Sequence, residues 1–268
     1  MEQIHAGRNA VGSASGAVTG VKISLRKTSL VDYPGKIASA FFFAGCNMRC
    51  PWCHNRELVL PELAGARDAG QEEFVSLERA LAHIEKRRNV LGGVVLSGGE
   101  PSLYRDLPAL IRRIKKMGLA VKLDTNGMNP GMLEKLLQTK ETTPDYIALD
   151  LKLAPVRYGE IAPDAEQSSR MLKSTRILTP AESLRKSADL IRSSGIDHEY
   201  RTLALPIITE KDIAALAELV DDSLWYVRAF RPGNCLDPAW DDFEASPARD
   251  VDALVDAIRA LGKSGVRG

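Results

Sequence analysis

The chain has 268 residues, of which 44% are hydrophobic and 26% charged, and its 36 lysines and arginines nearly balance 35 acidic residues. This length and apolar content predict one globular domain with a sizeable core. The neutral balance speaks against a nucleic-acid partner and an acidic membrane surface. No apolar run approaches the roughly eighteen residues of a membrane span, and residues 1–20 lack the pattern of a signal peptide. We expect a cytoplasmic protein with a flexible tail at 1–20 and a single domain over 21–268.

From residue 21 onward, apolar strand-like runs alternate with amphipathic helix-like segments. Near-continuous apolar runs are typical of strands buried on both faces of a parallel sheet. The expected strands are Ile37–Phe43, Gly93–Ser97, Ala120–Asp124, Tyr146–Leu151, Glu199–Leu205 and Trp225–Phe230. The expected helices are Leu77–Lys86, Leu107–Met117, Gly131–Gln138, Ser183–Ser193, Lys211–Asp221 and Asp250–Leu261. Six strand–helix units predict an α/β fold with a partial (β/α)6 TIM-like barrel, and a doubly wound sheet is the alternative.

A cysteine cluster follows the first expected strand. The stretch GCNMRCPWCHN places Cys46, Cys50 and Cys53 in a Cys-x3-Cys-x2-Cys pattern. Structural thiols rarely occur so close together, so the pattern predicts a metal or iron–sulfur site. Zinc and most iron–sulfur sites take four protein ligands, which leaves one position open. Cys235 could fill it, but a four-cysteine site would leave other motifs unexplained, so we expect Cys235 to be a partly buried thiol without a ligand role.

Polar groups also follow the later strands. The chain reads SGGEP at 97–101, DTNG at 124–127 and LDLK at 149–152; the fifth strand carries Arg201, and Cys235 follows the sixth. Taken singly, SGGEP and DTNG are ordinary turn sequences, and Asp150 with Lys152 could be a solvated ion pair. In a parallel barrel, however, all carboxyl ends of the strands open onto one face. The segments therefore predict one site.

In this order, CNMRCPWC, GGEP and DTNG resemble the radical S-adenosylmethionine (SAM) superfamily. The stretches SLVDYPGK (29–36), CHN (53–55), LDLK and HEYRT (198–202) are similar to the activating enzymes of glycyl radical enzymes. Within that group the chain looks most like the activator of anaerobic ribonucleoside-triphosphate reductase. The resemblance covers about residues 22 to 261.

The resemblance implies that a [4Fe–4S] cluster has three irons held by Cys46, Cys50 and Cys53. The amino and carboxylate groups of SAM would chelate the fourth iron, which answers the question of the open position. An electron from flavodoxin or ferredoxin would cleave SAM into methionine and a 5′-deoxyadenosyl radical. That radical would take a hydrogen atom from a glycine of the partner enzyme.

The resemblance also implies roles for single residues. Trp52 would contact adenine, Asn55 and Lys152 the polar groups of SAM, and Arg201 the SAM carboxylate or the partner. Gly98 and Gly99 would let the backbone approach SAM, and Glu100 would receive its ammonium group. A monovalent cation beside the SAM carboxylate would be held by Asp124, Thr125, Asp150 and a carbonyl near Ala148, and Asp124 also counts among the SAM contacts.

Three other functions stay open at this point. One is a zinc-stabilised interaction module, and another is a radical SAM enzyme for a small molecule, such as 7-carboxy-7-deazaguanine synthase. The third is an activator of a different glycyl radical enzyme. Many of those carry a ferredoxin-like insert with extra cysteines, whereas this chain has only Cys235 beyond the cluster motif.

Overall fold

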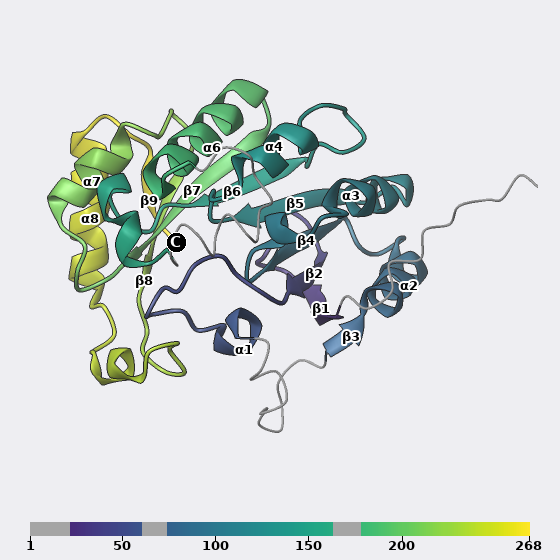
Figure 1. Cartoon of the computed structure of the whole chain (residues 1–268), viewed down its shortest axis with the longest axis horizontal. Coiled ribbons are helices and arrows are strands. Elements are labelled where there is room, and N and C mark those ends of the chain that lie inside the picture. The colour runs from purple at the N-terminus through teal and green to yellow at the C-terminus, as the bar shows by residue number, and fades with distance from the viewer. Residues whose placement is uncertain (1–21, 61–73, 163–177) are drawn as a thin grey trace, which may run out of the picture.

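The computed structural model describes residues 22–60, 74–162 and 178–268, so the expected tail at 1–20 lies outside the described residues. Strands and helices alternate along this part of the chain (Figure 1). In order, they are β1 (Lys22–Ser29), β2 (Ala38–Phe43), α1 (Arg56–Val59), β3 (Phe74–Ser76), α2 (Leu77–Arg87), β4 (Gly93–Gly98), η2 (Pro101–Leu103), α3 (Leu107–Lys116), β5 (Ala120–Thr125), α4 (Pro130–Leu136), β6 (Tyr146–Asp150), η3 (Pro155–Glu160), α6 (Pro180–Ser194), β7 (Asp197–Ala204), α7 (Glu210–Ala217), β8 (Trp225–Ala229), η4 (Pro238–Asp242), α8 (Ala248–Ala260) and β9 (Gly265–Arg267).

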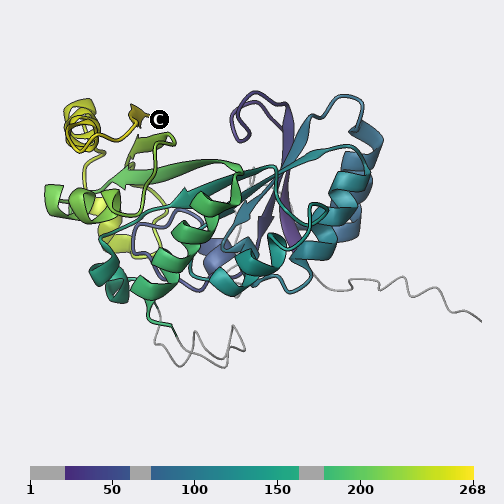
Figure 2. The ribbon, with the colours of Figure 1, turned by 90° about the horizontal axis from the view of Figure 1, so that it is seen from above.

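These strands form one sheet, in the order β3-β1-β2-β4-β5-β6-β7-β8-β9. The pairs from β2 to β9 are parallel, whereas β1 runs antiparallel to β2 and β3. From β2 onward each strand pairs with the next strand of the parallel series, without the reversal of order that defines a doubly wound sheet. Figure 2 shows the curved sheet with the helices on its outside. The expected partial barrel is confirmed.

The six expected strands are present with ends within two residues of prediction, and the six expected helices with ends within four. The sequence reading missed β1, β3 and β9. All three are peripheral in the sheet: β3 and β9 have three residues each, and β1 lies next to the edge. Short edge strands carry little hydrophobic pattern, because one side of the strand has no neighbour to pack against.

The two faces of the sheet have different chemistry. The outer face buries large side chains such as Phe41, Leu96 and Leu123 against Leu81 of α2 and Ile111 of α3, in one core cluster. Toward the amino ends of the strands, the inner face carries Ala38, Ala40 and Val95, and Tyr33 of the loop between β1 and β2 packs in the same cluster. Because side chains alternate along a strand, the buried outer face leaves every second position free to carry polar groups inside the barrel.

The loop between β1 and β2 closes the end of the barrel opposite the cysteines. Tyr33 of the SLVDYPGK stretch is buried, and its ring centroid lies 6.1 Å from that of Tyr146. A Cβ added to Gly93 would lie 2.9 Å from the Tyr33 ring. Gly93 and Tyr146 are the first residues of β4 and β6, so this motif lies at the amino ends of the parallel strands.

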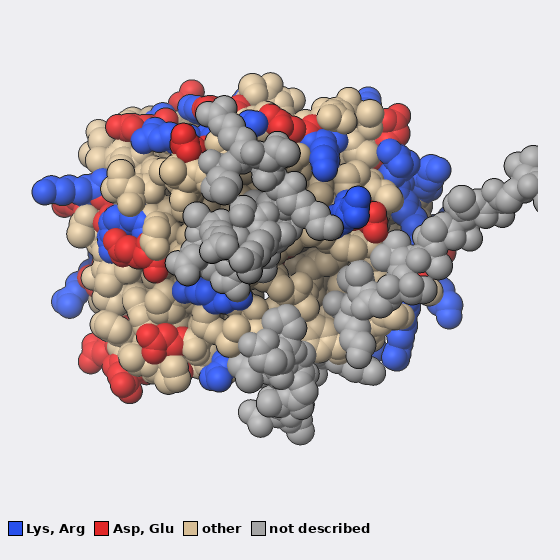
Figure 3. Space-filling view, viewed as in Figure 1, with Lys and Arg blue, Asp and Glu red and all other residues tan. Residues whose placement is uncertain are grey.

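Helix α6 begins and ends at recognisable capping residues. α6 begins with a capping box in which Thr179 and Glu182 satisfy each other's backbone N–H groups, and it ends at Gly195 with φ 70°. A left-handed residue at this position is most favourable for glycine, which has no Cβ. No helix in the described ranges combines the length and apolar character needed to cross a membrane. On the face shown in Figure 3, basic and acidic side chains are interspersed around the rim.

Candidate active site

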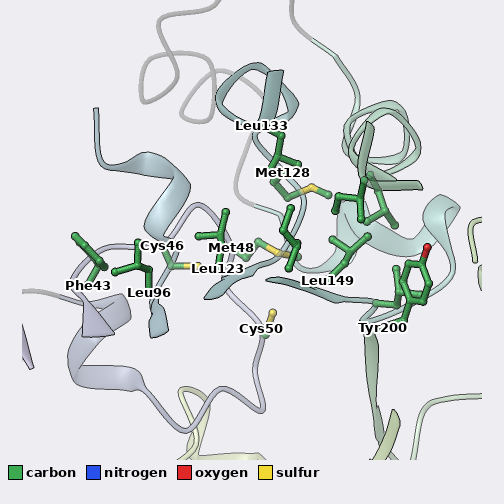
Figure 4. Packing of buried hydrophobic residues seen from close by; sticks show 14 of the residues in the cluster. Phe43, Cys46, Met48, Cys50, Leu96, Leu123, Met128, Leu133, Leu149 and Tyr200 are labelled. Atoms are coloured by element: carbon green, nitrogen blue, oxygen red, sulfur yellow. The ribbon is translucent and has the colours of Figure 1, made fainter. Parts of the chain in front are cut away.

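The cysteine loop leaves β2 and crosses the carboxyl ends of the neighbouring strands. Gly45 N donates to Leu58 O (2.6 Å), and Glu100 N donates to Gly45 O (2.9 Å). Further along the loop, Arg49 N donates to Ile161 O at 2.7 Å. Figure 4 shows Cys46 and Met48 beside Leu96 and Leu123 at the edge of the core, with Cys50 farther out on the same loop. The loop is therefore held in place by its own backbone.

The two glycines of SGGEP are required by contact with this loop. Gly98 has φ +116°, and a Cβ there would lie 2.3 Å from Phe43 N. A Cβ on Gly99 would lie 2.0 Å from Gly45 O. Atoms cannot approach so closely, so any side chain at either position would displace the chain that carries Cys46. The glycines thus allow close approach of this chain's own backbone, and an approach to SAM stays a prediction.

Glu100 ties SGGEP to DTNG. Its side chain is buried and accepts hydrogen bonds from Ser102 N (3.0 Å), Thr125 Oγ1 (2.8 Å) and Asn126 N (2.8 Å). Burial raises the pKa of Glu100, although these three donors act in the opposite direction. The carboxylate is thus engaged within the protein, and contact with the SAM ammonium group stays a prediction.

Asn126 is a site residue that the sequence reading treated only as part of a turn. Its Nδ2 donates to Asn47 Oδ1 (2.9 Å) and lies 3.8 Å from Cys46 Sγ, while its Oδ1 accepts from Met128 N (2.9 Å). An N–H group that points at a ligating sulfur is one of the features that tune an iron–sulfur cluster. Its place directly after Thr125 in DTNG was the available signal.

The acidic and basic residues predicted at the strand ends form a connected array. Arg201 Nε donates to Asp150 Oδ1 (2.8 Å), and its Nη1 lies 3.2 Å from Asp124 Oδ2. Lys152 Nζ donates to Asp150 Oδ2 at 3.2 Å. Burial raises the pKa of both carboxyls, but Arg201, together with Lys122 at Asp124 and Lys152 at Asp150, more than offsets this and the pKa of each is lowered. Both aspartates are therefore anions.

The same array bears on the predicted cation. The guanidinium of Arg201 bridges the two aspartates expected to hold the cation, and Thr125 Oγ1 donates to Glu100 and accepts from Gly127 N. The protein itself thus supplies a positive charge beside these oxygens. A monovalent cation held with the carbonyl near Ala148 stays a prediction.

A cavity of about 230 Å³ opens at this end of the barrel and brings most of the predicted residues together. Those on its wall are Cys46, Cys50, Trp52, Cys53, Asn55, Gly98, Gly99, Glu100, Asp124, Thr125, Asp150 and Lys152. Arg201 does not line it and lies behind the two aspartates. None of the lining residues comes from β8 or from the loop after it, so the sixth expected segment does not reach the cavity directly.

The loop after β8 instead supports the cysteine loop from behind. Asp237 N donates to Pro51 O at 2.9 Å. The ring centroid of Trp240 lies 5.1 Å from that of Trp52, and Trp240 also packs edge-on against Phe230 at 5.8 Å. Trp240 therefore backs the ring expected to contact adenine, a role that no local sequence pattern indicated.

Cys235 lies in this supporting loop, where it is fully buried, and it does not line the cavity. Burial, and then a hydrogen bond to Asp241, raise the pKa of its thiol to about 11. The structure therefore buries this thiol more completely than the partial burial that the sequence predicted. Its place off the cavity wall agrees with the absence of a ligand role, which stays a prediction.

The three clustered cysteines line the cavity, with Cys46 and Cys50 buried and Cys53 partly buried. Burial raises the pKa of Cys46 and of Cys50 to about 12 and also raises that of Cys53. Metal coordination deprotonates a thiol, and the positive charge of iron would meet this cost. Within the described ranges, no three His, Cys, Asp or Glu side chains converge on one ion position.

Comparison with known proteins agrees with this chemistry. The Radical SAM superfamily model matches residues 41–220. A Methanocaldococcus jannaschii protein named "Putative glycyl-radical enzyme activating enzyme" is 32% identical over 238 residues, which cover 88% of this chain and 87% of the relative. A pyruvate formate-lyase-activating enzyme of Streptococcus mutans is 30% identical over 202 residues, covering 73% of this chain and 69% of the relative.

Among solved structures, Streptococcus suis SuiB bound to S-adenosylmethionine has a TM-score of 0.50 at 13% identity. The match covers 80% of this chain and 44% of SuiB, and it is a likeness of fold alone. The family match and the full-length relative together carry the assignment. The chain belongs to the radical SAM superfamily, and within it to the enzymes that activate glycyl radical enzymes, whose cofactors are a [4Fe–4S] cluster and S-adenosylmethionine.

Proposed function

We propose that this enzyme generates a glycyl radical on anaerobic ribonucleoside-triphosphate reductase, with SAM bound in the cavity at the carboxyl ends of the strands. The observation that carries the proposal is the single cavity that gathers three thiols with Asp124, Asp150 and Lys152. Thiols alone could bind zinc, and the ion pairs alone could be structural. Their convergence on one cavity supports a site for a cluster together with a charged organic molecule.

In this proposal Cys46, Cys50 and Cys53 hold three irons of the cluster. When bound, the cluster and SAM supply one-electron chemistry that ends in abstraction of a hydrogen atom, which no side chain can perform. The protein's own contribution is to bind and orient SAM and to exclude water. The side chains proposed to face SAM are those of Trp52, Asn55, Glu100, Asp124 and Lys152, with the backbone of Gly98 and Gly99.

Arg201 acts in this scheme through Asp124 and Asp150 rather than by touching SAM, because it lies behind both carboxylates. Lys152 presents its ammonium group at the cavity wall, where it suits the SAM carboxylate or ribose. Each turnover consumes one electron, which we assign to flavodoxin or ferredoxin. The hydrogen atom leaves the glycine Cα and ends on 5′-deoxyadenosine.

The choice of the reductase as partner depends on the SLVDYPGK and CHN stretches. The first of these lies at the closed end of the barrel, where Tyr33 is buried, and so at the opposite end of the strands from the cavity. A glycine loop entering the open end of the barrel would also seal the cavity from water.

The test mixes the reduced, cluster-loaded protein with SAM and each glycyl radical enzyme from the same genome, without oxygen. Electron paramagnetic resonance should detect the glycyl doublet on the reductase. A doublet on another enzyme would overturn the partner assignment. SAM-dependent turnover of a small molecule, without any glycyl signal, would overturn the activation of a protein.

The cluster ligands are tested separately by iron and sulfide analysis of single Cys→Ala variants. We expect variants at Cys46, Cys50 and Cys53 to lose the cluster and the variant at Cys235 to keep it. Loss of the cluster in Cys235→Ala would show that a fourth thiol takes part. Colourless protein after anaerobic purification, with zinc bound, would support the interaction-module alternative.

A further inference from the structure

Lys122 is a buried cation inside the barrel that no sequence motif pointed to. It precedes Asp124 by two residues on β5, so both side chains point to the inner face. Its side chain is only 2% exposed, and its Nζ lies 2.6 Å from Asp124 Oδ1 and 3.8 Å from Glu199 Oε1. Lysine is almost never buried unless it is paired, because an uncompensated charge in an apolar interior is costly.

Lys122 ends a chain of alternating charges that runs from the barrel interior to the cavity wall. Asp124 accepts from Lys122 on one oxygen and contacts Arg201 with the other (2.6 and 3.2 Å). Arg201 reaches Asp150 (2.8 Å), and Asp150 reaches Lys152 (3.2 Å). Of these five residues, Asp124, Asp150 and Lys152 line the cavity, whereas Lys122 and Arg201 do not.

Glu199 completes the set on the inner side. Its Oε1 lies 3.8 Å from Lys122 Nζ and 3.9 Å from Arg201 Nη1, and its Oε2 accepts from Tyr146 OH at 3.0 Å. Three cations (Lys122, Lys152 and Arg201) then face three carboxylates (Asp124, Asp150 and Glu199). The array is neutral as a whole, although it is largely buried.

We infer that Lys122 and Glu199 are positioning residues for SAM: they hold Asp124 and Arg201 in the arrangement that the cavity wall requires, without touching SAM themselves. The inference rests on the proposed function. Both carboxylate oxygens of Asp124 have a cationic partner only while Lys122 is present. Without Lys122 the array carries one excess negative charge, and Asp124 and Glu199 then compete for the Nη1 of Arg201, which draws Asp124 away from its present place.

A purely structural role makes a different prediction. If the pair only stabilises the barrel, its loss lowers the melting temperature but leaves the SAM affinity of the folded protein unchanged. If it positions the array, a single charge removal weakens SAM binding, and removal of both charges restores neutrality and much of the affinity. A double-mutant cycle separates these cases, because coupled residues in one network are not additive.

The experiment uses the full chain with its cluster reconstituted anaerobically. Equilibrium dialysis with radiolabelled SAM gives Kd for the wild type, Lys122→Met, Glu199→Gln and the double variant, while iron content and thermal unfolding report on integrity. Lys115→Met is the matched control, because Lys115 pairs with Asp145 (3.0 Å) outside the array. We expect Kd to rise about tenfold in each single variant of the pair, to recover most of that loss in the double variant, and to be unchanged in the control.

Unchanged Kd in Lys122→Met or in Glu199→Gln, with only a lower melting temperature, would overturn the inference. So would a double variant whose loss is the sum of the single losses. If Lys122→Met does not fold, the inference is tested by the Kd for SAM of Glu199→Gln against that of the wild type and of Lys115→Met. A wild-type protein with an intact cluster that does not bind SAM would instead overturn the proposed function.

Discussion

Gly99→Ala should disable the site through one misplaced methyl group. Gly99 has no left-handed backbone conformation, so the substitution tests steric contact alone, whereas Gly98 would add backbone strain. The new Cβ would lie 2.0 Å from Gly45 O, and real Cβ contacts shorter than 3.0 Å essentially do not occur. The loop that carries Cys46 must therefore retreat by about 1 Å.

The cost follows from two local effects. Overpacking a tight site costs about 1–3 kcal/mol. Displacing Gly45 O also breaks its hydrogen bond from Glu100 N (2.9 Å), worth about 1 kcal/mol. The sum of about 2–4 kcal/mol corresponds to a fall in Tm of roughly 4–16 °C for a chain of this size. A displacement of about 1 Å at a reacting centre can lower the rate by about a hundredfold.

The assay measures Tm by circular dichroism, iron and sulfide per chain, and the rate of 5′-deoxyadenosine formation. Gly159→Ala is the matched control, since a Cβ there has no atom within 4 Å and no left-handed φ. We expect the control to behave as wild type. A Gly99→Ala protein with wild-type Tm, cluster content and SAM cleavage would refute the steric argument.

Three further predictions concern neighbouring features. Asn126→Ala removes the N–H group near Cys46 Sγ and should lower the reduction potential of the cluster; an unchanged potential in a redox titration would contradict this. Trp240→Ala should lower the free energy of unfolding by about 3–5 kcal/mol and weaken SAM binding, because Trp52 loses the ring that packs against it. Phe243→Ala should lower the free energy of unfolding far less, because Phe243 is half-exposed. Equal effects of the two substitutions on Tm and on the Kd for SAM would contradict this prediction. Burial raises the pKa of Asp212, but hydrogen bonds from Thr209, Ala154 N and Arg157 outweigh this and hold the pKa below its ordinary value of 3.8. The ionised carboxylate therefore stabilises the fold above pH 3.8, and this stabilisation is lost as the pH falls through the lowered pKa of the folded protein. Asp212→Asn should therefore lower the free energy of unfolding by about 1.5–3 kcal/mol at pH 7, and this loss should shrink as the pH falls through the lowered pKa; a loss that does not change with pH would count against the ion pair.

The sequence by itself determined the architecture and the outline of the site. Six apolar runs predicted six of the seven parallel strands to within two residues, because burial on both faces leaves a near-continuous hydrophobic signal. The spacing of Cys46, Cys50 and Cys53 indicated a cluster, since the residues of one loop are close in space whatever the fold. The rule that strand carboxyl ends share one face then predicted which side chains meet there.

Only the tertiary structure decided which of those side chains reach the cavity and what supports them. Arg201 was expected at the wall but lies behind two aspartates, and Cys235 belongs to a loop that backs the cysteines without lining the cavity. In the sequence, Lys122 is one charged residue in an apolar strand. Its role depends on Glu199, which lies 77 positions later in the sequence, although its Oε1 is 3.8 Å from Lys122 Nζ. Periodicity shows which face a residue takes, but distances between side chains from different strands are set by the curvature of the sheet and by how the helices pack against it.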